Sequence, residues 1–276
     1  MKVLLLGEIV GRCGTGVIKH ALRKFRKQND IDFVIAGGEC VTGGYGLGFS
    51  NAQLLLGMGI DVLTMGEKSF YKDDMVQNIG RKDRILRPAN FPENAPGRGV
   101  KYYNVGEKKI CVINSLGMLG FQNPHLANPF LKAEALVASA REITPFVFYV
   151  FHAQATAEKK AMGYLLDGKA SAVCGLHTKV QTSDATVLAG KTAYITDLGR
   201  CGSLMSVGGF KPENEIKKFR TGVVFRSMES FESPVMQGLL VTLDDTGFAL
   251  FCEAVSLSVD VPLPKDFSGQ EAVTGE

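Results

Sequence analysis

Five ionisable side chains of the types that bind metals follow short apolar segments in this chain. They are Glu8, Glu39, Glu67, His152 and His177. Each glutamate comes directly after a glycine, and each histidine comes just past the end of an apolar run. Carboxylates and imidazoles are the groups from which protein sites for divalent metals are built. One such residue alone is more often a solvated or structural side chain, but the recurrence of the pattern predicts a metal site.

The stretch 144–182 is predicted to bring the two histidines together. It contains apolar runs at 146–151 and 170–174, which are typical of buried strands, with a segment of helical composition at 157–166 between them. Two strands joined through a helix lie parallel, so their carboxyl ends open at the same edge of the sheet. Open α/β sheets bind ligands at that edge. We therefore expect both histidines to face one crevice.

The glutamates follow predicted strands at 3–6, 33–36 and 62–65. In a single parallel sheet, all five side chains would converge on one edge. The remaining β structure is predicted as a hairpin across 106–116, a strand at 191–196 and strands across 222–255. Predicted helices cover 17–27, 51–58, 128–140 and 213–220. We predict an α/β fold with one domain over residues 1–262 and a polar, disordered tail over residues 263–276.

The composition is that of an ordinary globular protein. The chain has 276 residues, of which 45% are hydrophobic and 21% charged, and 31 basic against 28 acidic residues give a net charge of +3. No basic run carries interleaved aromatic residues, so there is no footprint for DNA or RNA. No apolar stretch approaches the about 20 residues that a membrane span needs. The six cysteines form no C-x-x-C pair, which favours free thiols in a cytoplasmic protein.

Six segments of the chain resemble the motifs of a known family. They are Gly-Glu-Ile-Val-Gly at 7–11, Gly-Gly-Glu-Cys at 37–40, Thr-Met-Gly-Glu-Lys at 64–68, Arg-Pro-Ala-Asn-Phe-Pro at 87–92, Phe-His-Ala-Gln-Ala-Thr at 151–156 and Gly-Leu-His-Thr-Lys-Val-Gln-Thr at 175–182. These segments look like the bacterial YmdB-type metallophosphoesterases of the calcineurin-like superfamily, from Met1 to about Pro262. The resemblance implies a four-layer α/β/β/α sandwich, a dinuclear metal site and phosphodiesterase activity on 2′,3′-cyclic nucleotides. It also implies a homo-oligomer.

The resemblance assigns roles to individual residues, and the chain departs from the family at several of them. It implies a first metal at the positions of Glu8, Glu39, Cys40 and Lys179. It implies a second metal at the positions of Glu39, Glu67, His152 and His177, and a proton donor at the position of Lys68. Family members usually carry Asp at position 8, Asn at 40 and 67, and His at 68 and 179. An ammonium group has no lone pair for a metal, so Lys179 removes a ligand of the first site.

The charge of this group of residues favours few metal ions. The three glutamates and the two lysines leave a net charge of −1, which one divalent ion changes to +1 and two ions change to +3. Buried charge without compensation is costly. We therefore expect zero or one divalent ion of the manganese, iron or zinc type, held by the second set of residues, and no dinuclear centre.

Three hypotheses about function follow. The leading one is a catalytically degenerate relative that acts by binding, in which Lys68 and Lys179 pair with the glutamates and hold a phosphate-bearing small molecule; a protein partner is a second kind of ligand. The alternative is a phosphodiesterase that works with one metal at Glu39, Glu67, His152 and His177. The third is unrelated chemistry with Cys40 as nucleophile, for which a passive thiol is the simpler interpretation.

Overall fold

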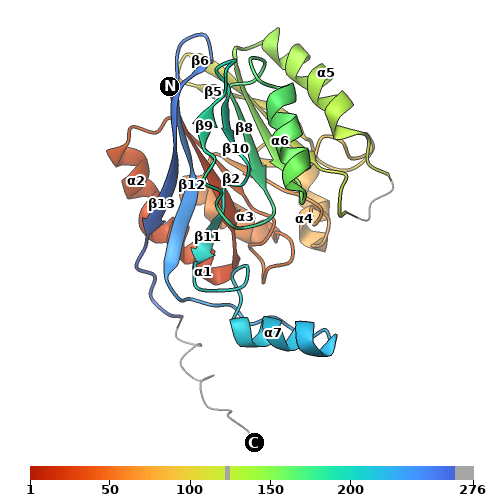
Figure 1. Ribbon diagram of the computed structural model, residues 1–276, viewed down its shortest axis with the longest axis vertical. Helices are drawn as coiled ribbons and strands as arrows, with labels where there is room; N and C mark the ends of the chain where they lie inside the picture. Colours follow the sequence, from red (N-terminus) through yellow and green to blue (C-terminus); the bar gives the residue numbers. More distant parts are fainter. Residues whose placement is uncertain (122–124, 265–276) are drawn as a thin grey trace, which may run out of the picture.

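The computed structural model of the protein describes residues 1–121 and 125–264 and shows two β-sheets flanked by helices (Figure 1). The predicted tail lies outside these residues, apart from positions 263 and 264. The seven-stranded sheet has the order β13-β12-β11-β1-β2-β3-β4. Its strands are β1 (Lys2–Ile9), β2 (Phe33–Gly37), β3 (Val62–Thr64), β4 (Ile85–Leu86), β11 (Arg200–Ser203), β12 (Pro234–Leu243) and β13 (Ala249–Ser258).

The second sheet has six strands in the order β5-β6-β7-β8-β10-β9. They are β5 (Val100–Val105), β6 (Lys108–Leu116), β7 (Phe146–His152), β8 (Ala172–Leu176), β9 (Thr186–Val187) and β10 (Ala193–Ile195). The helices are α1 (Gly11–Val17), α2 (Arg23–Gln28), α3 (Phe49–Gly57), α4 (Asp73–Asn78), α5 (Pro129–Arg141), α6 (Thr156–Leu165) and α7 (Pro212–Thr221). A π-helical turn (Ile18–Leu22) joins α1 to α2, and a 3-10 turn (Ile79–Arg81) follows α4.

Three apolar cores separate four layers. In β1, Leu4 and Leu6 belong to the core beneath helices α1 to α3, whereas Leu5 belongs to the core between the two sheets. In β7, Phe148 faces the core between the sheets and Tyr149 faces the core beneath α5 and α6. This alternation follows from the two-residue repeat of a strand, and both faces are covered, so the strands read as continuous apolar runs. The predicted four-layer α/β/β/α sandwich is confirmed.

The site residues come from two sheets, so the expectation of a single sheet edge was wrong. Strands β1, β2 and β3 run parallel in the seven-stranded sheet, and β7 and β8 run parallel in the six-stranded sheet. The sheets stack with the carboxyl ends of these strands at the same end of the sandwich. Apolar runs identify strands but do not say which sheet each one joins, because pairing depends on segments far away in the chain.

Two element boundaries also differ from the prediction. The helical segment expected from position 17 begins at Gly11, directly after β1. Of the β structure expected across 222–255, only β12 and β13 form, joined by the predicted turn at 244–247, while residues 222–233 belong to no named strand. None of the helices in the described ranges is both long and apolar enough to span a membrane.

Candidate metal centre

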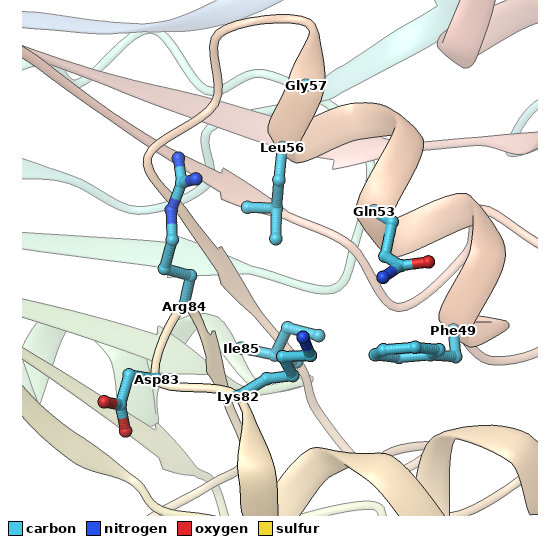
Figure 2. Close-up of a pocket in the computed structure, with 8 residues that line it drawn as sticks. All are labelled: Phe49, Gln53, Leu56, Gly57, Lys82, Asp83, Arg84 and Ile85. Carbon is cyan, nitrogen blue, oxygen red and sulfur yellow. The ribbon is translucent and has the colours of Figure 1, made fainter.

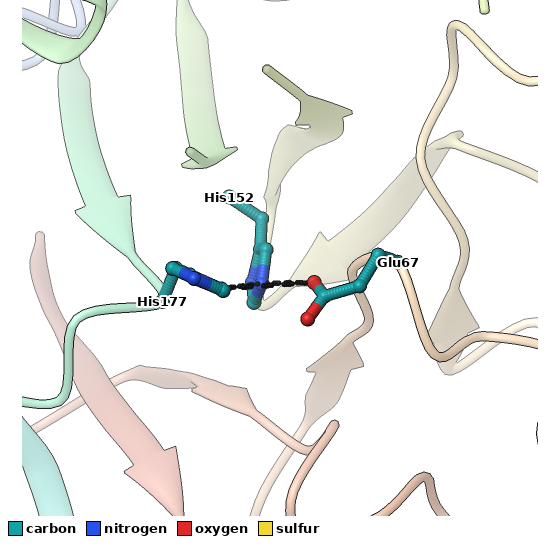
Figure 3. A group of neighbouring side chains, drawn as sticks. All are labelled: Glu67, His152 and His177. Atoms are coloured by element: carbon teal, nitrogen blue, oxygen red, sulfur yellow. Dashed lines mark hydrogen bonds and ion pairs between the residues drawn. The ribbon is translucent and has the colours of Figure 1, made fainter. Parts of the chain in front are cut away.

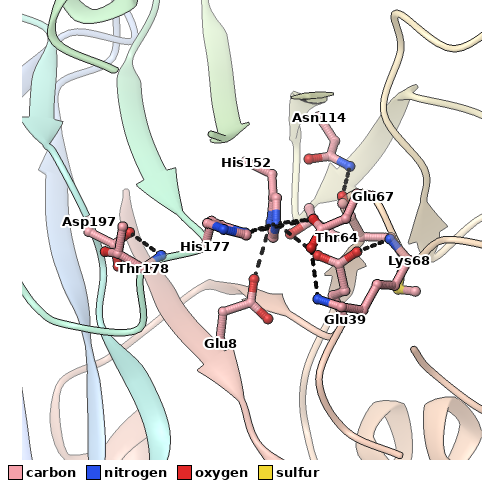
Figure 4. Close-up of polar contacts among 12 residues, drawn as sticks. Glu8, Glu39, Thr64, Glu67, Lys68, Asn114, His152, His177, Thr178 and Asp197 are labelled. Atoms are coloured by element: carbon pink, nitrogen blue, oxygen red, sulfur yellow. Dashed lines mark hydrogen bonds and ion pairs between the residues drawn. The ribbon is translucent and has the colours of Figure 1, made fainter. Parts of the chain in front are cut away.

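His152 lies at the middle of the predicted cluster, and all three glutamates approach its ring (Figure 4). Its Nδ1 is 3.2 Å from Glu8 Oε1. Its Nε2 is 2.8 Å from Glu39 Oε2 and 2.7 Å from Glu67 Oε2. His152 ends β7, Glu8 lies near the end of β1, and the other two glutamates lie in the turns that follow β2 and β3. The ends of four strands therefore meet at this imidazole.

His177, which follows β8, completes one group of donor atoms (Figure 3). Its Nδ1 lies 3.0 Å from His152 Nε2 and 3.7 Å from Glu67 Oε2. The φ angle of His177 is +102°, a conformation that costs energy for a residue with a side chain and that is found where surrounding structure enforces it. A hydrogen bond of the following residue fixes the backbone at His177: the N–H of Thr178 donates to Asp197 Oδ2 at 3.1 Å.

The donor atoms fit a divalent cation. Glu67, His152 and His177 offer three atoms that lie within 4.8 Å of one another, and Glu8, Glu39 and His152 offer a second such group. Three buried carboxylate oxygens, Glu8 Oε1, Glu39 Oε2 and Glu67 Oε2, have only histidine ring nitrogens close to them among the described residues, and Glu8 Oε2 has no hydrogen-bond partner there. Buried anionic oxygens without donors are unfavourable unless a cation compensates them. Glu39 was expected to be common to both metal positions, whereas His152 is the residue that belongs to both groups of donor atoms.

The charges of the glutamates control the protonation of His152. Burial alone would lower the pKa of this imidazole, but the adjacent carboxylates, Glu39 first among them, raise the pKa well above its ordinary value. Conversely, burial would raise the pKa of Glu8 and Glu67, but the nearby His152 lowers both. The cluster therefore strongly favours a positive charge at its centre. A metal ion that binds His152 must displace the proton that it carries.

The two lysines at family metal and proton-donor positions behave differently. Lys68 Nζ lies 2.7 Å from Glu67 Oε1, and its backbone N–H donates to Glu39 Oε1. The ion pair expected for Lys68 is therefore present. The one expected for Lys179 is absent, because no carboxylate in the described ranges comes within 4.0 Å of its ammonium. Burial would lower the pKa of Lys179, but the charges of Cys40 and Glu8 outweigh it and raise the pKa.

Similarity to known proteins agrees with this geometry. Residues 4–255 match the family described as YmdB-like protein. A relative from Bacillus subtilis (strain 168), named 2′,3′-cyclic-nucleotide 2′-phosphodiesterase, is 38% identical over 245 residues, which cover 89% of this chain and 92% of the relative. This chain belongs to the YmdB-like family. The resemblance seen in the sequence motifs is thereby confirmed, and the relatives support a function of the metallophosphoesterase type.

Solved structures share the fold of this YmdB-like protein. A phosphatase from Mycoplasma pneumoniae has a TM-score of 0.87 and 28% sequence identity, and the match covers 95% of both chains. A hypothetical protein from Thermus thermophilus also has a TM-score of 0.87 and 28% identity, and the match covers 95% of this chain and 100% of the other. The similarity therefore extends over nearly the whole sandwich.

Cys40 does not have the environment of a nucleophile in this YmdB-like protein. The residue is 2% exposed, and burial raises the pKa of its thiol to about 12, with the charge of Glu8 acting in the same direction. The thiolate is the reactive form of cysteine. The hypothesis of chemistry at Cys40 is therefore not supported, and a passive thiol accounts for the residue.

Two residues that position the cluster were not singled out from the sequence. Lys159 Nζ on α6 lies 2.7 Å from Asp197 Oδ2, and both side chains are buried. Asp197 then accepts the N–H group of Thr178, next to His177. Asp197 carries the same signal as the glutamates, since it follows the apolar run of β10. Lys159 gave no such signal, because charged residues on helices usually face solvent.

A separate cavity of about 430 Å³ lies between α3 and residues 82–85 (Figure 2). Phe49 and Lys82 belong to its lining, with the ammonium 5.6 Å from the centre of the aromatic ring. None of the metal-centre residues lines this cavity. The cavity therefore lies along α3 and is distinct from the metal centre.

Proposed function

We propose that this chain binds one divalent metal ion and a phosphate-bearing small molecule, and that it has lost two-metal ester hydrolysis. The observation that carries the proposal is the place of Lys179. Lys179 stands where the family pattern calls for a metal ligand, and the charge of Glu8 is among the causes that raise the pKa of its ammonium. An ammonium cannot ligate a metal, and its charge repels a second cation.

One ion is supported by the residues that remain. Glu67, His152 and His177 can hold it, and Glu39 Oε2 lies 2.8 Å from the same imidazole nitrogen of His152. When bound, a divalent ion supplies a positive charge that polarises a phosphate oxygen. Hydrolysis in a two-metal site draws its nucleophile from a hydroxide held between both ions. A chain that lacks the first site keeps the means of binding a phosphate ester without that source of nucleophile.

The proton donor is also compromised. Lys68 stands where the family pattern has its acid, and it is paired with Glu67 at 2.7 Å. Burial would lower the pKa of this lysine, but the charges around it, Cys40 and Glu39 first, raise it above its usual value. A general acid works best when its pKa is near the operating pH. Lys68 is better suited to hold a phosphate oxygen by its charge than to protonate a leaving group.

A second function has one observation in its favour. The relative named 2′,3′-cyclic-nucleotide 2′-phosphodiesterase matches almost the full chain at 38% identity, and the Glu67, His152 and His177 group is retained. A phosphodiesterase that works with a single metal at these residues and Glu39 would keep the family's activity. Lys179 would then stabilise charge on the phosphate.

Metal content and turnover separate the two proposals. Elemental analysis of purified protein should find no more than one divalent ion per chain, and the variant His152→Ala should lose it. The matched control is His20→Ala, since His20 is exposed in the π-helical turn between α1 and α2 and belongs to neither group of donor atoms. Hydrolysis of bis-p-nitrophenyl phosphate or 2′,3′-cyclic AMP with manganese should barely exceed background. Two ions per chain would overturn the leading proposal, and strong turnover abolished by His152→Ala would establish the one-metal enzyme.

Self-association and binding of a protein partner are proposed alongside. Helix α7 has no buried residue, and Phe219 on it is 87% exposed, which supports a contact with another chain. Sedimentation velocity of the full chain measures self-association. A cytoplasmic location is likewise a proposal, in keeping with six free cysteines.

A further inference from the structure

Arg200 is a buried cation with no anionic partner among the described residues. The residue is 6% exposed, and the only hydrogen bond of its guanidinium among the described residues runs from Nη1 to Ser206 Oγ at 3.2 Å. Its Nε is buried with no acceptor in the described part of the chain. Burial of this group lowers the pKa of the guanidinium. Burial of a guanidinium without a carboxylate partner costs free energy.

The strand places Arg200 on the side of the metal centre. In β11, Arg200 lies directly opposite Glu8 of β1. The following residue, Cys201, belongs to the core beneath the helices. Because side chains alternate along a strand, Arg200 points to the opposite side of the sheet, the side from which Glu8 reaches His152. The guanidinium and the metal centre therefore share one face at the ends of neighbouring strands.

The side chain of Lys179, which has no ion pair among the described residues, approaches the same loop, residues 204–209. The loop accepts the hydrogen bond of Arg200 at Ser206. At Gly208, an added Cβ would lie 3.9 Å from Lys179 Cδ. The N–H of Gly208 has no acceptor in the described ranges, and its φ of +62° is a left-handed conformation. Such backbone exposes N–H groups in concavities that bind anions. Within the described residues, two cations without an ion pair and one N–H group without an acceptor thus border one loop.

We propose that Arg200, Lys179 and the N–H of Gly208 form an anion subsite beside the metal centre, and that it takes a phosphate group of the ligand. The inference rests on the proposed binding of a phosphate-bearing small molecule and adds a second point of attachment to it. A guanidinium, an ammonium and a peptide N–H are the donors that recognise phosphate oxygens, and the guanidinium adds directional bonds to the charge of the ammonium. No carboxylate in the described residues competes for Arg200.

The test uses inorganic phosphate as the probe and keeps metal out of the measurement. Phosphate is titrated calorimetrically into the full chain in the presence of EDTA, for the wild type, Arg200→Leu, Arg200→Lys and Arg220→Leu. Arg220 on α7 is exposed, so its variant has the same change of net charge without touching the subsite. Arg200→Leu should weaken phosphate binding by about tenfold or more, as expected for loss of a charge-assisted hydrogen bond. The phosphate affinity of Arg200→Lys should lie between those of the wild type and Arg200→Leu, and that of Arg220→Leu should match the wild type.

Each outcome decides the proposal. If Arg200→Leu lowers the melting temperature but binds phosphate as the wild type does, Arg200 only braces the loop and the proposal is wrong. Absence of phosphate binding by the wild type would also overturn it. If Arg200→Leu does not fold, Arg200→Lys carries the decision, and unchanged affinity in that variant counts against the subsite. Because EDTA is present throughout, these outcomes are independent of the number of metal ions and of turnover.

Discussion

Lys159 and Asp197 form an ion pair inside the six-stranded side of the sandwich, with Nζ 2.7 Å from Oδ2 and both side chains at most 1% exposed. The carboxylate of Asp197 also accepts hydrogen bonds from two backbone N–H groups. Its Oδ2 accepts the N–H of Thr178 and its Oδ1 accepts the N–H of Gly199. Since Thr178 directly follows His177, this pair fixes the backbone that presents a metal-centre histidine.

Removal of one partner of this pair should destabilise the protein strongly. Lys159→Met leaves the Asp197 carboxylate buried without its cation, which typically costs about 3–5 kcal/mol. The double variant Lys159→Met/Asp197→Leu should lose less than the sum of the single variants, as a double-mutant cycle in urea will show. The control is Lys169→Met, whose pair with Glu134 is half exposed and should be worth no more than about 1 kcal/mol. A cost for Lys159→Met no greater than for this control would contradict the prediction.

A methyl group at Gly66 should disrupt the metal centre. A Cβ at this position would lie 2.3 Å from Glu39 Oε2 and 2.4 Å from His152 Cδ2, closer than van der Waals contact allows. We expect Gly66→Ala to weaken manganese binding by about tenfold or more, in the range of changes that misplace metal ligands. Titration of manganese into the metal-free protein measures this affinity.

Gly57→Ala is the matched control for Gly66→Ala. Gly57 ends α3, and an added Cβ would meet no atom within 4 Å. Alanine restricts the unfolded chain and favours the helix, so this variant should gain about 0.4–1 kcal/mol of stability and bind manganese as the wild type does. Equal manganese affinity in both variants would show that the cluster is not the metal site.

Restoration of the family pattern should recover activity only when it is complete. Lys179→His alone should leave turnover of bis-p-nitrophenyl phosphate near background, because Lys68 still occupies the position of the acid. The five changes together, Glu8→Asp, Cys40→Asn, Glu67→Asn, Lys68→His and Lys179→His, should bring manganese-dependent turnover and a second ion per chain. If the fivefold variant folds, binds two ions and remains inactive, the losses proposed here do not explain the chemistry.

The thiols should be slow to react in the native state. All six cysteines are buried, and burial raises the pKa of Cys13, Cys40, Cys111 and Cys201 to about 12. Ellman's reagent at pH 8 should therefore detect less than one fast thiol per folded chain and six after denaturation in guanidinium. A fast thiol removed by Cys40→Ser would reopen the hypothesis of a nucleophilic cysteine.

The sequence by itself determined the strands and the ligand types of this protein. Buried parallel strands must be apolar on both faces, so β1, β2, β7 and β8 stand out as short apolar runs. Glutamates and histidines at their ends then marked the metal centre, because strand ends are where the backbone opens to a ligand. The motifs around these residues were sufficient to identify the family.

Only the tertiary structure decided how these residues are partnered. Pairing of β1 with β11 and β12, about 200 residues away in the chain, puts Arg200 opposite Glu8. It also decided that the glutamates and the histidines arrive from different sheets. The sequence could not show that Lys68 is paired and Lys179 is not, since this depends on distances of a few ångströms between segments that are remote in sequence. Local periodicity reports the burial of a residue, whereas charge pairing is set by long-range packing.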